Sequence, residues 1–504
     1  MFGLFSPRCP VDLREKTWVE LRLQWLVDRL GLDRLREVEV ITPSDRHFPE
    51  KYDGTDADIE RLFAQVCDFM TIPRDSVELS LFDNTEPAPD IYDSRGHALG
   101  LYMGRTREGE SHTIWIERSQ AAQPLHLIAT AAHELAHCVL LGDKWLTDAD
   151  ADHEFVTDLL PVALGLGVFC ANAAIFEKSH QFERSSWRSV SKSGYLPARM
   201  FGYALAVFAW LREERQPDWG RHLNADPRSA FKAGLDYLRK KNDCLCDRSV
   251  QPVGSSAGGL SARLNSDVPG ARLGALWELR RPDAPPLSER DWRAVVECLD
   301  HRDPILVCEA GVTIAALRRP DVEIVRKALN HLIDSSPDRD VHAALALAIG
   351  TQKEVFVAHP ELLPTAIDQL VRLLEEESPR VVKAALTALK GLATPLDFFG
   401  FRQLMQVFRL GLVNCDDLLV AHAVEALRAV CESPKKEAAT FFHDDVELTS
   451  HALAALSSEI DEGTLPTVRL PTSASWPVPL PDWRPAEIRL PVDEHERESD
   501  GEVE

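Results

Sequence analysis

The stretch "AAHELAHCVLLGD", residues 131–143, contains two histidines four positions apart, with a glutamate directly after the first. It belongs to a segment without glycine or proline that runs from Leu125 to Leu141, between Pro124 and Gly142. Proline suits the first position of a helix, and glycine suits the residue just past its end. We therefore predict a single helix across this stretch.

On such a helix, His133 and His137 project from the same face about one turn apart. Their imidazole nitrogens can bind a single divalent ion. Glu134 lies beside the pair and can take a proton from a water molecule whose pKa the ion has lowered. Two surface histidines on an ordinary amphipathic helix would give the same pattern, so a third ligand must decide between the interpretations.

The segment "DHEFVTD", residues 152–158, offers that ligand near the start of a second predicted helix. Glu154 and Asp158 are four positions apart and share a helix face. If the two helices pack side by side, Glu154 completes the set of metal ligands and Asp158 accepts the outer N–H of one histidine. His153 is the competing ligand, but it points about 100° away around the helix. We favour Glu154 because Asp158 shares its face.

These residues resemble the gluzincin class of zinc metallopeptidases, which includes thermolysin. The resemblance covers residues 131–158 and has a short spacer of 16 residues between the second histidine and the downstream glutamate. It implies roles for five residues: zinc ligands His133, His137 and Glu154, general base Glu134, and Asp158 as the partner of a histidine ligand. The first half of the chain is also similar to a group of bacterial proteins, which implies no substrate.

Other metal-binding motifs fit less well. A metzincin would need glycine and histidine where Leu140 and Asp143 stand. An EF-hand calcium loop would need glycine and glutamate where His153 and Leu159 stand. The same ligands also hold manganese or cobalt, so Zn²⁺ is the expectation from ligand type and availability.

The first 120 residues mix helical and strand patterns. "WVELRLQWLVDRLGL", residues 18–32, predicts an amphipathic helix. Residues 36–43 and 76–83 alternate with period two, and residues 98–119 read as two strands around a glycine-containing turn. A small sheet before the histidine helix gives the first predicted domain, an α+β zincin-like domain over residues 1–245.

A peptidase also needs groups that hold the substrate and its transition state. We expect the strand "HTIWIE" to lie at a sheet edge, where residues 113–117 would pair with an extended peptide. Tyr195, Tyr203 and His180 follow the predicted metal helices and are candidate donors to a developing oxyanion. Aromatic residues at helical spacing more often belong to a core, so none of the three is selected.

From about residue 260 the sequence changes to repeated helices rich in alanine and leucine. An Ala-Leu pair recurs at separations of 29 to 42 residues, ending at positions 276, 317, 347, 389, 427 and 456. This spacing suits one helix pair per unit and is similar to HEAT-type repeats. We predict an all-α, HEAT-like α-solenoid over residues 255–460, with an irregular helical bundle as the alternative.

The last segment, residues 461–504, has seven prolines and 11 acidic against four basic residues. This composition cannot bury enough apolar surface to order itself, so we predict a disordered, acidic, proline-rich tail. Its "WPVPLPDW" stretch is a spacer or a docking strip of polyproline type.

Charge and cysteine usage exclude several classes of function. The formal net charge of −24 disfavours binding to nucleic acid and to anionic membranes. Ten cysteines, without paired spacing apart from Cys244 and Cys246, indicate a reducing compartment, and the first residues contain no secretory signal, so we expect a cytoplasmic protein. The uncharged run at residues 159–176 could span a membrane, but Pro161, its glycines and Asn172 suit a buried core helix better.

Together these features predict a cytoplasmic, zinc-dependent peptidase that acts on a protein or peptide substrate, with a solenoid that selects substrates or binds a protein partner. The competing hypothesis is a non-catalytic protein-binding scaffold with a structural or vestigial metal site. The intact motif favours the peptidase, because a site that only holds metal has no need of Glu134.

Overall fold

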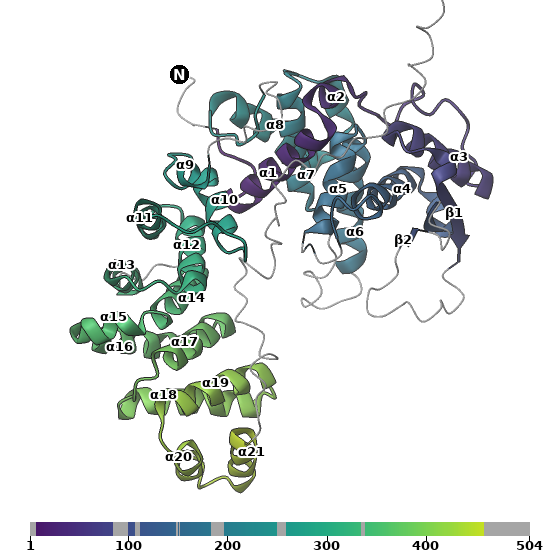
Figure 1. The fold of residues 1–504 in the computed structure, drawn as a ribbon. Coiled ribbons are helices and arrows are strands. Elements are labelled where there is room, and N and C mark those ends of the chain that lie inside the picture. Colours follow the sequence, from purple (N-terminus) through teal and green to yellow (C-terminus); the bar gives the residue numbers. More distant parts are fainter. Residues whose placement is uncertain are drawn as a thin grey trace, which may run out of the picture. The chain divides into compact units, whose positions relative to one another are not determined.

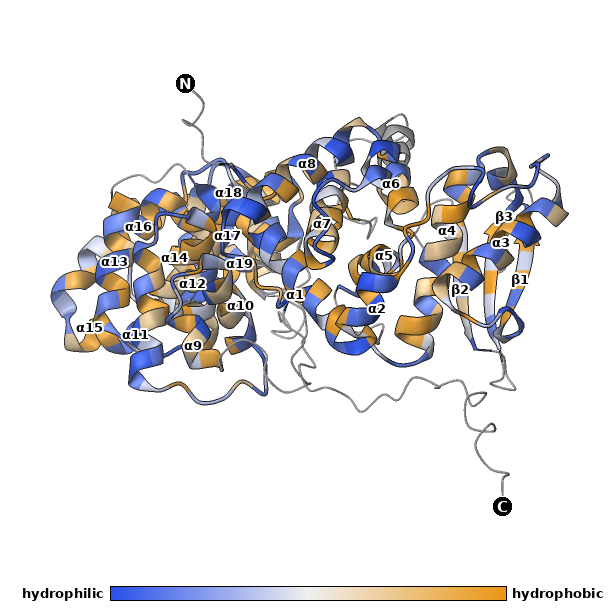
Figure 2. Ribbon diagram, turned by 90° about the horizontal axis from the view of Figure 1, so that it is seen from above, coloured by the Kyte–Doolittle hydropathy of each residue, from blue (hydrophilic) through white to orange (hydrophobic). Residues whose placement is uncertain are grey.

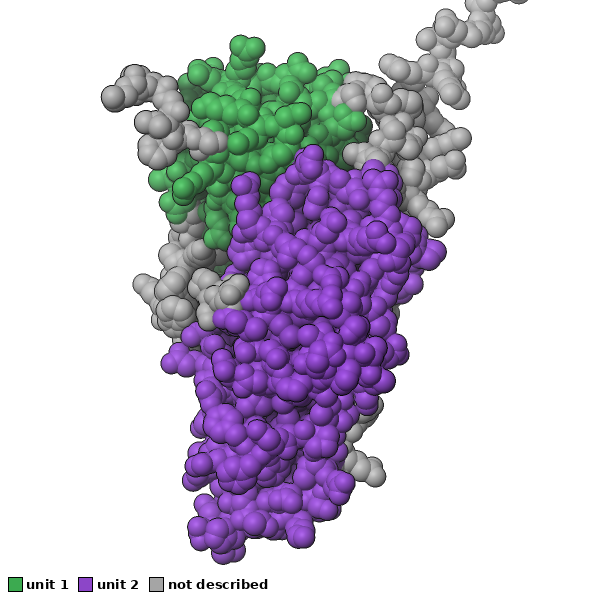
Figure 3. All heavy atoms as spheres, turned by 90° about the vertical axis from the view of Figure 1, so that its left-hand side faces the viewer, with its two compact units in different colours: residues 1–258, 479–504 green, residues 259–478 purple. Residues whose placement is uncertain are grey.

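The computed structural model describes residues 7–83, 99–105, 111–147, 150, 152–182, 196–248, 259–333 and 338–457. These residues form two compact units, coloured separately in Figure 3. Unit 1 holds the described residues up to 248, and unit 2 holds those from 259 onward. The predicted tail at residues 461–504 lies outside the described residues.

The described residues are mostly helical, with one small sheet in unit 1, and this confirms the coarse prediction for the fold (Figure 1). The helices of unit 1 are α1 (Leu13–Leu30), α2 (Leu32–Glu37), α3 (Asp56–Met70), α4 (Pro124–His137), α5 (His153–Ala163), α6 (Gly167–Phe182), α7 (Ala198–Leu211) and α8 (Ala225–Lys240). Its strands are β1 (Val77–Phe82), β2 (Gly100–Arg105) and β3 (His112–Glu117).

The sheet has the order β1-β3-β2, so β3 is its central strand. β3 pairs in parallel with β1 and antiparallel with β2. Our expectation that "HTIWIE" lies at a sheet edge is therefore wrong, because its backbone groups already bond on both sides. The strand that packs against α4 from an edge of this sheet is β2.

The expected strand at residues 36–43 is also wrong. α2 ends at Glu37, and the chain then runs outside any sheet. The buried Ile41 donates its backbone N–H to the carbonyl oxygen of Gly165 at 2.9 Å. A Cβ at Gly165 would lie 2.2 Å from the carbonyl oxygen of Glu39. The alternating residues thus pack on the turn between α5 and α6 and pair with no strand.

The apolar run at residues 159–176 is divided between two helices. Gly165 has a φ of +86° and separates α5, which ends at Ala163, from α6, which begins at Gly167. Among the described residues, one helix is long and apolar enough to cross a membrane, at Pro124–Gly142. It carries the motif histidines, and 67% of its apolar window is buried inside the protein, as in the core helix of a folded domain.

α1 packs against α5 and α7, and it begins five residues before the predicted helix. Five of its charged side chains are at most 9% exposed: Arg14, Glu15, Lys16, Glu20 and Arg22. Such burial is tolerated only when each charge has partners. The Glu20 carboxylate, for example, accepts hydrogen bonds from Tyr203 Oη at 2.6 Å and Lys16 Nζ at 3.0 Å. The helix is confirmed, but its charged residues do not form a solvent face.

The described residues of unit 2 contain helices and no strand. They are α9 (Leu260–Leu264), α10 (Pro269–Leu279), α11 (Glu289–Glu297), α12 (Pro304–Leu317), α13 (Val322–Ile333), α14 (Arg339–Gly350), α15 (Lys353–Ala358), α16 (Leu363–Leu373), α17 (Pro379–Leu392), α18 (Phe398–Val413), α19 (Asp417–Val430), α20 (Pro434–Phe441) and α21 (Val446–Ser457).

The helices of unit 2 stack in layers. One layer follows the contacts of α10 with α12, α12 with α14, α14 with α17, α17 with α19, and α19 with α21. The six Ala-Leu pairs that marked the predicted repeats lie on these six helices, one on each. α13, α16 and α18 form a second layer against the first. The helices of both layers carry hydrophobic and hydrophilic residues together, as Figure 2 shows.

Small residues let the first layer pack closely. A Cβ at Gly350 would lie 2.5 Å from Ala388 Cα, and one at Gly391 would lie 2.3 Å from the carbonyl oxygen of Gly350. Both clashes are with backbone atoms, so α14 and α17 can approach this closely only because these positions have no side chain. The alanine-rich pattern of the sequence thus reports close helix packing.

Candidate metal centre

α4 presents the two motif histidines from the buried face of one helix. Pro124 occupies its first turn as predicted, and the side chains of His133 and His137 are buried. The helix continues past His137 as a π-helical turn, Cys138–Gly142, so Gly142 closes that turn and does not follow the end of an ordinary α-helix. A Cβ at Gly142 would lie 2.2 Å from His112 Cε1, and this contact requires a glycine.

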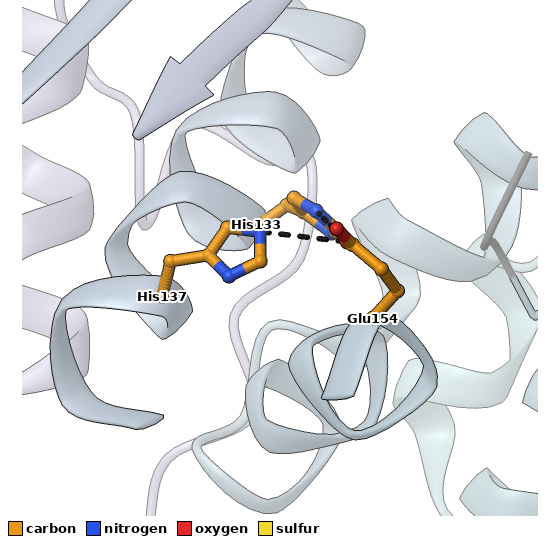
Figure 4. Close-up of side chains that lie close together, drawn as sticks. All are labelled: His133, His137 and Glu154. Carbon is orange, nitrogen blue, oxygen red and sulfur yellow. Dashed lines mark ion pairs between the residues drawn. The ribbon is translucent and has the colours of Figure 1, made fainter. Parts of the chain in front are cut away.

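α5 brings the predicted third ligand to the same point. Its N-cap is Asp152, whose side chain makes no capping bond. Glu154 Oε2 lies 3.4 Å from His133 Nε2 and 3.5 Å from His137 Nε2. Figure 4 shows both rings directed at this carboxylate from the neighbouring helix. The two helices therefore meet side by side, as the short spacer requires.

The geometry of the three side chains fits a divalent ion. Their ligand atoms lie within 4.8 Å of one another. Ligands bound about 2.0–2.1 Å from a tetrahedral ion lie roughly 3.4 Å apart. Both distances from Glu154 to the histidine nitrogens match that separation. His133, His137 and Glu154 could thus hold one ion and leave a fourth position open.

Neighbouring side chains hold the outer nitrogens of both histidines. His133 Nδ1 donates to Asp158 Oδ1 at 2.9 Å, and Asp158 Oδ2 accepts the backbone N–H of Leu196 at 2.7 Å. Thr157 Oγ1 lies 3.4 Å from His137 Nδ1 and donates its own proton to the carbonyl oxygen of His153. With protons on both Nδ1 atoms, the two Nε2 lone pairs are free to bind a metal.

Thr157 was not among the predicted site residues, although the sequence contained a signal for it. Thr157 lies three positions after Glu154 and directly before Asp158. Residues three and four apart share a helix face. The face that offers Glu154 to a metal therefore also offers Thr157 and Asp158 to the two histidines.

Strand β2 forms a wall of the site. The ring of Tyr102 stacks on the ring of His137, with centroids 5.9 Å apart and an angle of 14° between the planes. Tyr102 Oη lies 3.0 Å from Nδ1 of the buried His112. A Cβ at Gly100 would lie 2.8 Å from Glu134 Oε1. The strand approaches Glu134 this closely because residue 100 has no side chain.

Burial and charge set the protonation of the metal-free site. Burial acts to lower the pKa of His133, but hydrogen bonds with Asp158 and Glu154 and the charges of Asp158 and Glu134 outweigh it and raise this pKa well above its ordinary value. Burial acts to raise the pKa of Glu154, yet its interactions with both histidines lower that pKa. A metal ion must therefore displace a proton from the site, because imidazole binds a metal only when deprotonated.

Glu134 lies beside the three ligand residues but is not one of them. Its side chain is 5% exposed, and burial raises its pKa above the ordinary glutamate value. The backbone of Tyr102 and the fields of His133 and His137 partly oppose that rise. A buried carboxylate next to a possible metal site is a candidate for proton exchange with a bound molecule.

His153, the competing third ligand, does not join the ligand cluster. It is not one of the three convergent residues, and its ring centroid lies 6.4 Å from that of His137. Its buried Nδ1 lies 3.8 Å from Glu154 Oε1 and has no hydrogen-bond partner among the described residues. His153 therefore places a buried ring nitrogen beside the site, within ion-pair distance of Glu154 but without a hydrogen bond among the described residues.

Tyr203, Tyr195 and His180 were the predicted candidates for an oxyanion donor. Tyr203 is fully buried and donates its hydroxyl to Glu20 at 2.6 Å, so it belongs to the core network of α1. Tyr195 and the side chain of His180 lie outside the described residues.

No family model, curated protein or solved structure matches this chain. The site is therefore defined by its own geometry.

We predict that the wild-type protein binds one divalent ion per chain and that His133→Ala abolishes this binding. The substitution removes one of three protein ligands and leaves too few to hold the ion. Elemental analysis after dialysis against a weak chelator measures the stoichiometry. His126→Ala, on the same helix but outside the ligand cluster, is the control and should keep one ion. Equal metal content in wild type and His133→Ala would contradict the assignment.

Proposed function

We propose that unit 1 is a zinc-dependent hydrolase that cleaves peptide bonds. The observation that carries this proposal is Glu134, a buried carboxylate held against the ligand cluster without being a ligand. A site that served only to hold a metal would gain nothing from burying an extra carboxylate, since such burial costs free energy.

Zinc is the proposed ion because two imidazoles and one carboxylate with an open fourth position are typical of its catalytic sites. When bound, such an ion polarises a carbonyl group and lowers the pKa of water. Glu134, buried beside the ligand cluster without being part of it, would accept a proton from the attacking water and pass it to the leaving amine nitrogen. Asp158 and Thr157 would keep the two imidazoles oriented throughout this cycle.

We propose β2, in place of the strand at 112–117, as the strand that pairs with an extended peptide. β2 is at a sheet edge, contacts α4, and passes directly over Glu134 at Gly100. Edge strands recognise extended peptides through main-chain hydrogen bonds. A bound peptide would therefore present its backbone carbonyl groups beside Glu134.

His153 is the proposed donor to the oxyanion that forms on the scissile carbonyl. Its ring centroid lies 6.4 Å from that of His137, and its Nδ1 makes no hydrogen bond among the described residues, although it lies 3.8 Å from Glu154 Oε1. A donor of this kind acts on charge that develops only in the transition state.

The layered helices of unit 2 support the proposal of a HEAT-like solenoid that selects protein substrates or binds a protein partner. The six Ala-Leu pairs that end at positions 276, 317, 347, 389, 427 and 456 lie on successive helices of the first layer, as expected for one helix pair per repeat. The domain limits 1–245 and 255–460, the acidic tail at 461–504, and a cytoplasmic location remain part of this proposal. The net charge of −24 argues against a nucleic-acid partner or an anionic membrane surface.

We predict that Glu134→Gln keeps the metal but loses hydrolysis. Glutamine has nearly the same shape, so metal affinity should stay within about threefold, whereas loss of a general base costs about 10²–10⁴-fold in rate. The assay is cleavage of a library of quenched fluorescent peptides by zinc-loaded protein. If wild type cleaves no peptide in a broad library, the scaffold hypothesis is favoured; if Glu134→Gln is as active as wild type, the general-base role is wrong.

We predict that His153→Ala lowers kcat by about 10²–10³-fold, the usual cost of losing one oxyanion donor. Zinc affinity should change by less than about threefold, because His153 lies outside the ligand cluster. Steady-state kinetics and a chelator competition on the same preparation measure the two quantities. A parallel loss of zinc affinity would instead make His153 a support for the ligands.

A further inference from the structure

α1 makes a buried ionic contact with Asp152, the N-cap residue of α5. The carboxylate of Asp152 is fully buried, and its two oxygens accept hydrogen bonds from Arg22 Nε and Nη2, each at 2.6 Å. Trp18 Nε1 donates to the same carboxylate at 2.9 Å. The pair is bidentate, which fixes the direction of the carboxylate as well as its position.

This contact is two residues away from the metal ligand Glu154. Asp152 occupies the N-cap position of α5, but its side chain is turned away from the helix and toward α1. A second contact follows on α5, where Phe155 packs edge-on against Trp18 with ring centroids 5.8 Å apart. Contacts with α1 thus fix α5 on both sides of Glu154.

The segment that joins the two metal helices is held by the same face of α1. Trp145, which lies between α4 and α5, packs against Trp25 with ring centroids 6.2 Å apart. Trp18, Arg22 and Trp25 are spaced four and three apart and therefore lie along one side of α1. That side receives the loop after His137 and the start of α5, so it determines where Glu154 meets the histidines.

We propose that Arg22, assisted by Trp18, is a positioning residue that acts through Asp152 to hold Glu154 at the metal site. Glu154 is the ligand that most needs such support, since its side chain is 32% exposed whereas those of His133 and His137 are 8% and 9% exposed. Carboxylate ligands bind well only when their own position is fixed by surrounding groups. The inference rests on the metal site and not on hydrolysis.

The test is the affinity of the full-length protein for zinc, measured by competition with a chromophoric chelator and without any substrate. Arg22→Lys keeps the charge but cannot form the bidentate contact. We expect it to bind zinc about 10–100-fold more weakly, as is usual for groups that orient metal ligands. Trp18→Phe removes one donor to Asp152 and should weaken binding by a smaller factor. Unchanged affinity in folded Arg22→Lys would overturn the proposal.

A matched control separates positioning from general loss of stability. Arg199 of α7 pairs with Glu15 of α1. This ion pair includes no residue of α5. Arg199→Met should leave zinc affinity within about threefold, even if it lowers the urea midpoint; a loss as large as that of Arg22→Lys would show that any disturbance of α1 weakens the site.

A double variant covers the case in which Arg22→Lys fails to fold. In Arg22→Met/Asp152→Leu both charges are replaced by apolar side chains, and such replacements often restore stability. We expect this folded variant still to bind zinc weakly, and a Co²⁺ absorption spectrum should report an altered set of ligands. Wild-type affinity and spectrum would show that the ion pair serves folding alone.

Discussion

On our proposal, the candidate metal centre depends on the carboxylate of Asp152, which lies fully inside the protein. Burial of a charge is costly unless ionic and hydrogen-bonding partners surround it. Arg22 and Trp18 supply those partners from α1, and the start of α5 is consequently fixed against that helix. Because α5 carries Glu154 two positions later, the free energy that stabilises the core also places a metal ligand.

The rest of the site follows from two helices that meet at this fixed start. One face of α5 offers a ligand and the two groups that orient the histidines of α4. Space is limited on the other side of α4, where glycines at positions 100 and 142 admit β2 and the rings of Tyr102 and His112. α5 thus orients the imidazoles, whereas the lack of side chains at positions 100 and 142 lets β2 and the two rings pack closely. These are separate constraints, met by different elements.

Sequence reasoning recovered what local spacing encodes. The four-residue spacing of His133 and His137, and that of Glu154 and Asp158, place each pair on one helix face, and no distant contact alters this. It failed where partners are remote in sequence: the Arg22 and Asp152 side chains are 130 positions apart, and nothing in the sequence around either marks the pair. The central position of β3 was missed for the same reason, because its parallel partner β1 comes from an earlier segment. The period-two pattern at residues 36–43 resembles that of a strand, but these residues pack on the turn between α5 and α6.

X-ray absorption at the zinc edge of the zinc-loaded protein tests the central claim most directly, since it reports the ligand atoms themselves. The account predicts four nitrogen and oxygen neighbours at about 2.0–2.1 Å, with the multiple-scattering signature of two imidazoles, and loss of one oxygen neighbour in Glu154→Ala. Sulfur neighbours at about 2.3 Å, or a spectrum unaffected by Glu154→Ala, would show that zinc is held elsewhere and would contradict it.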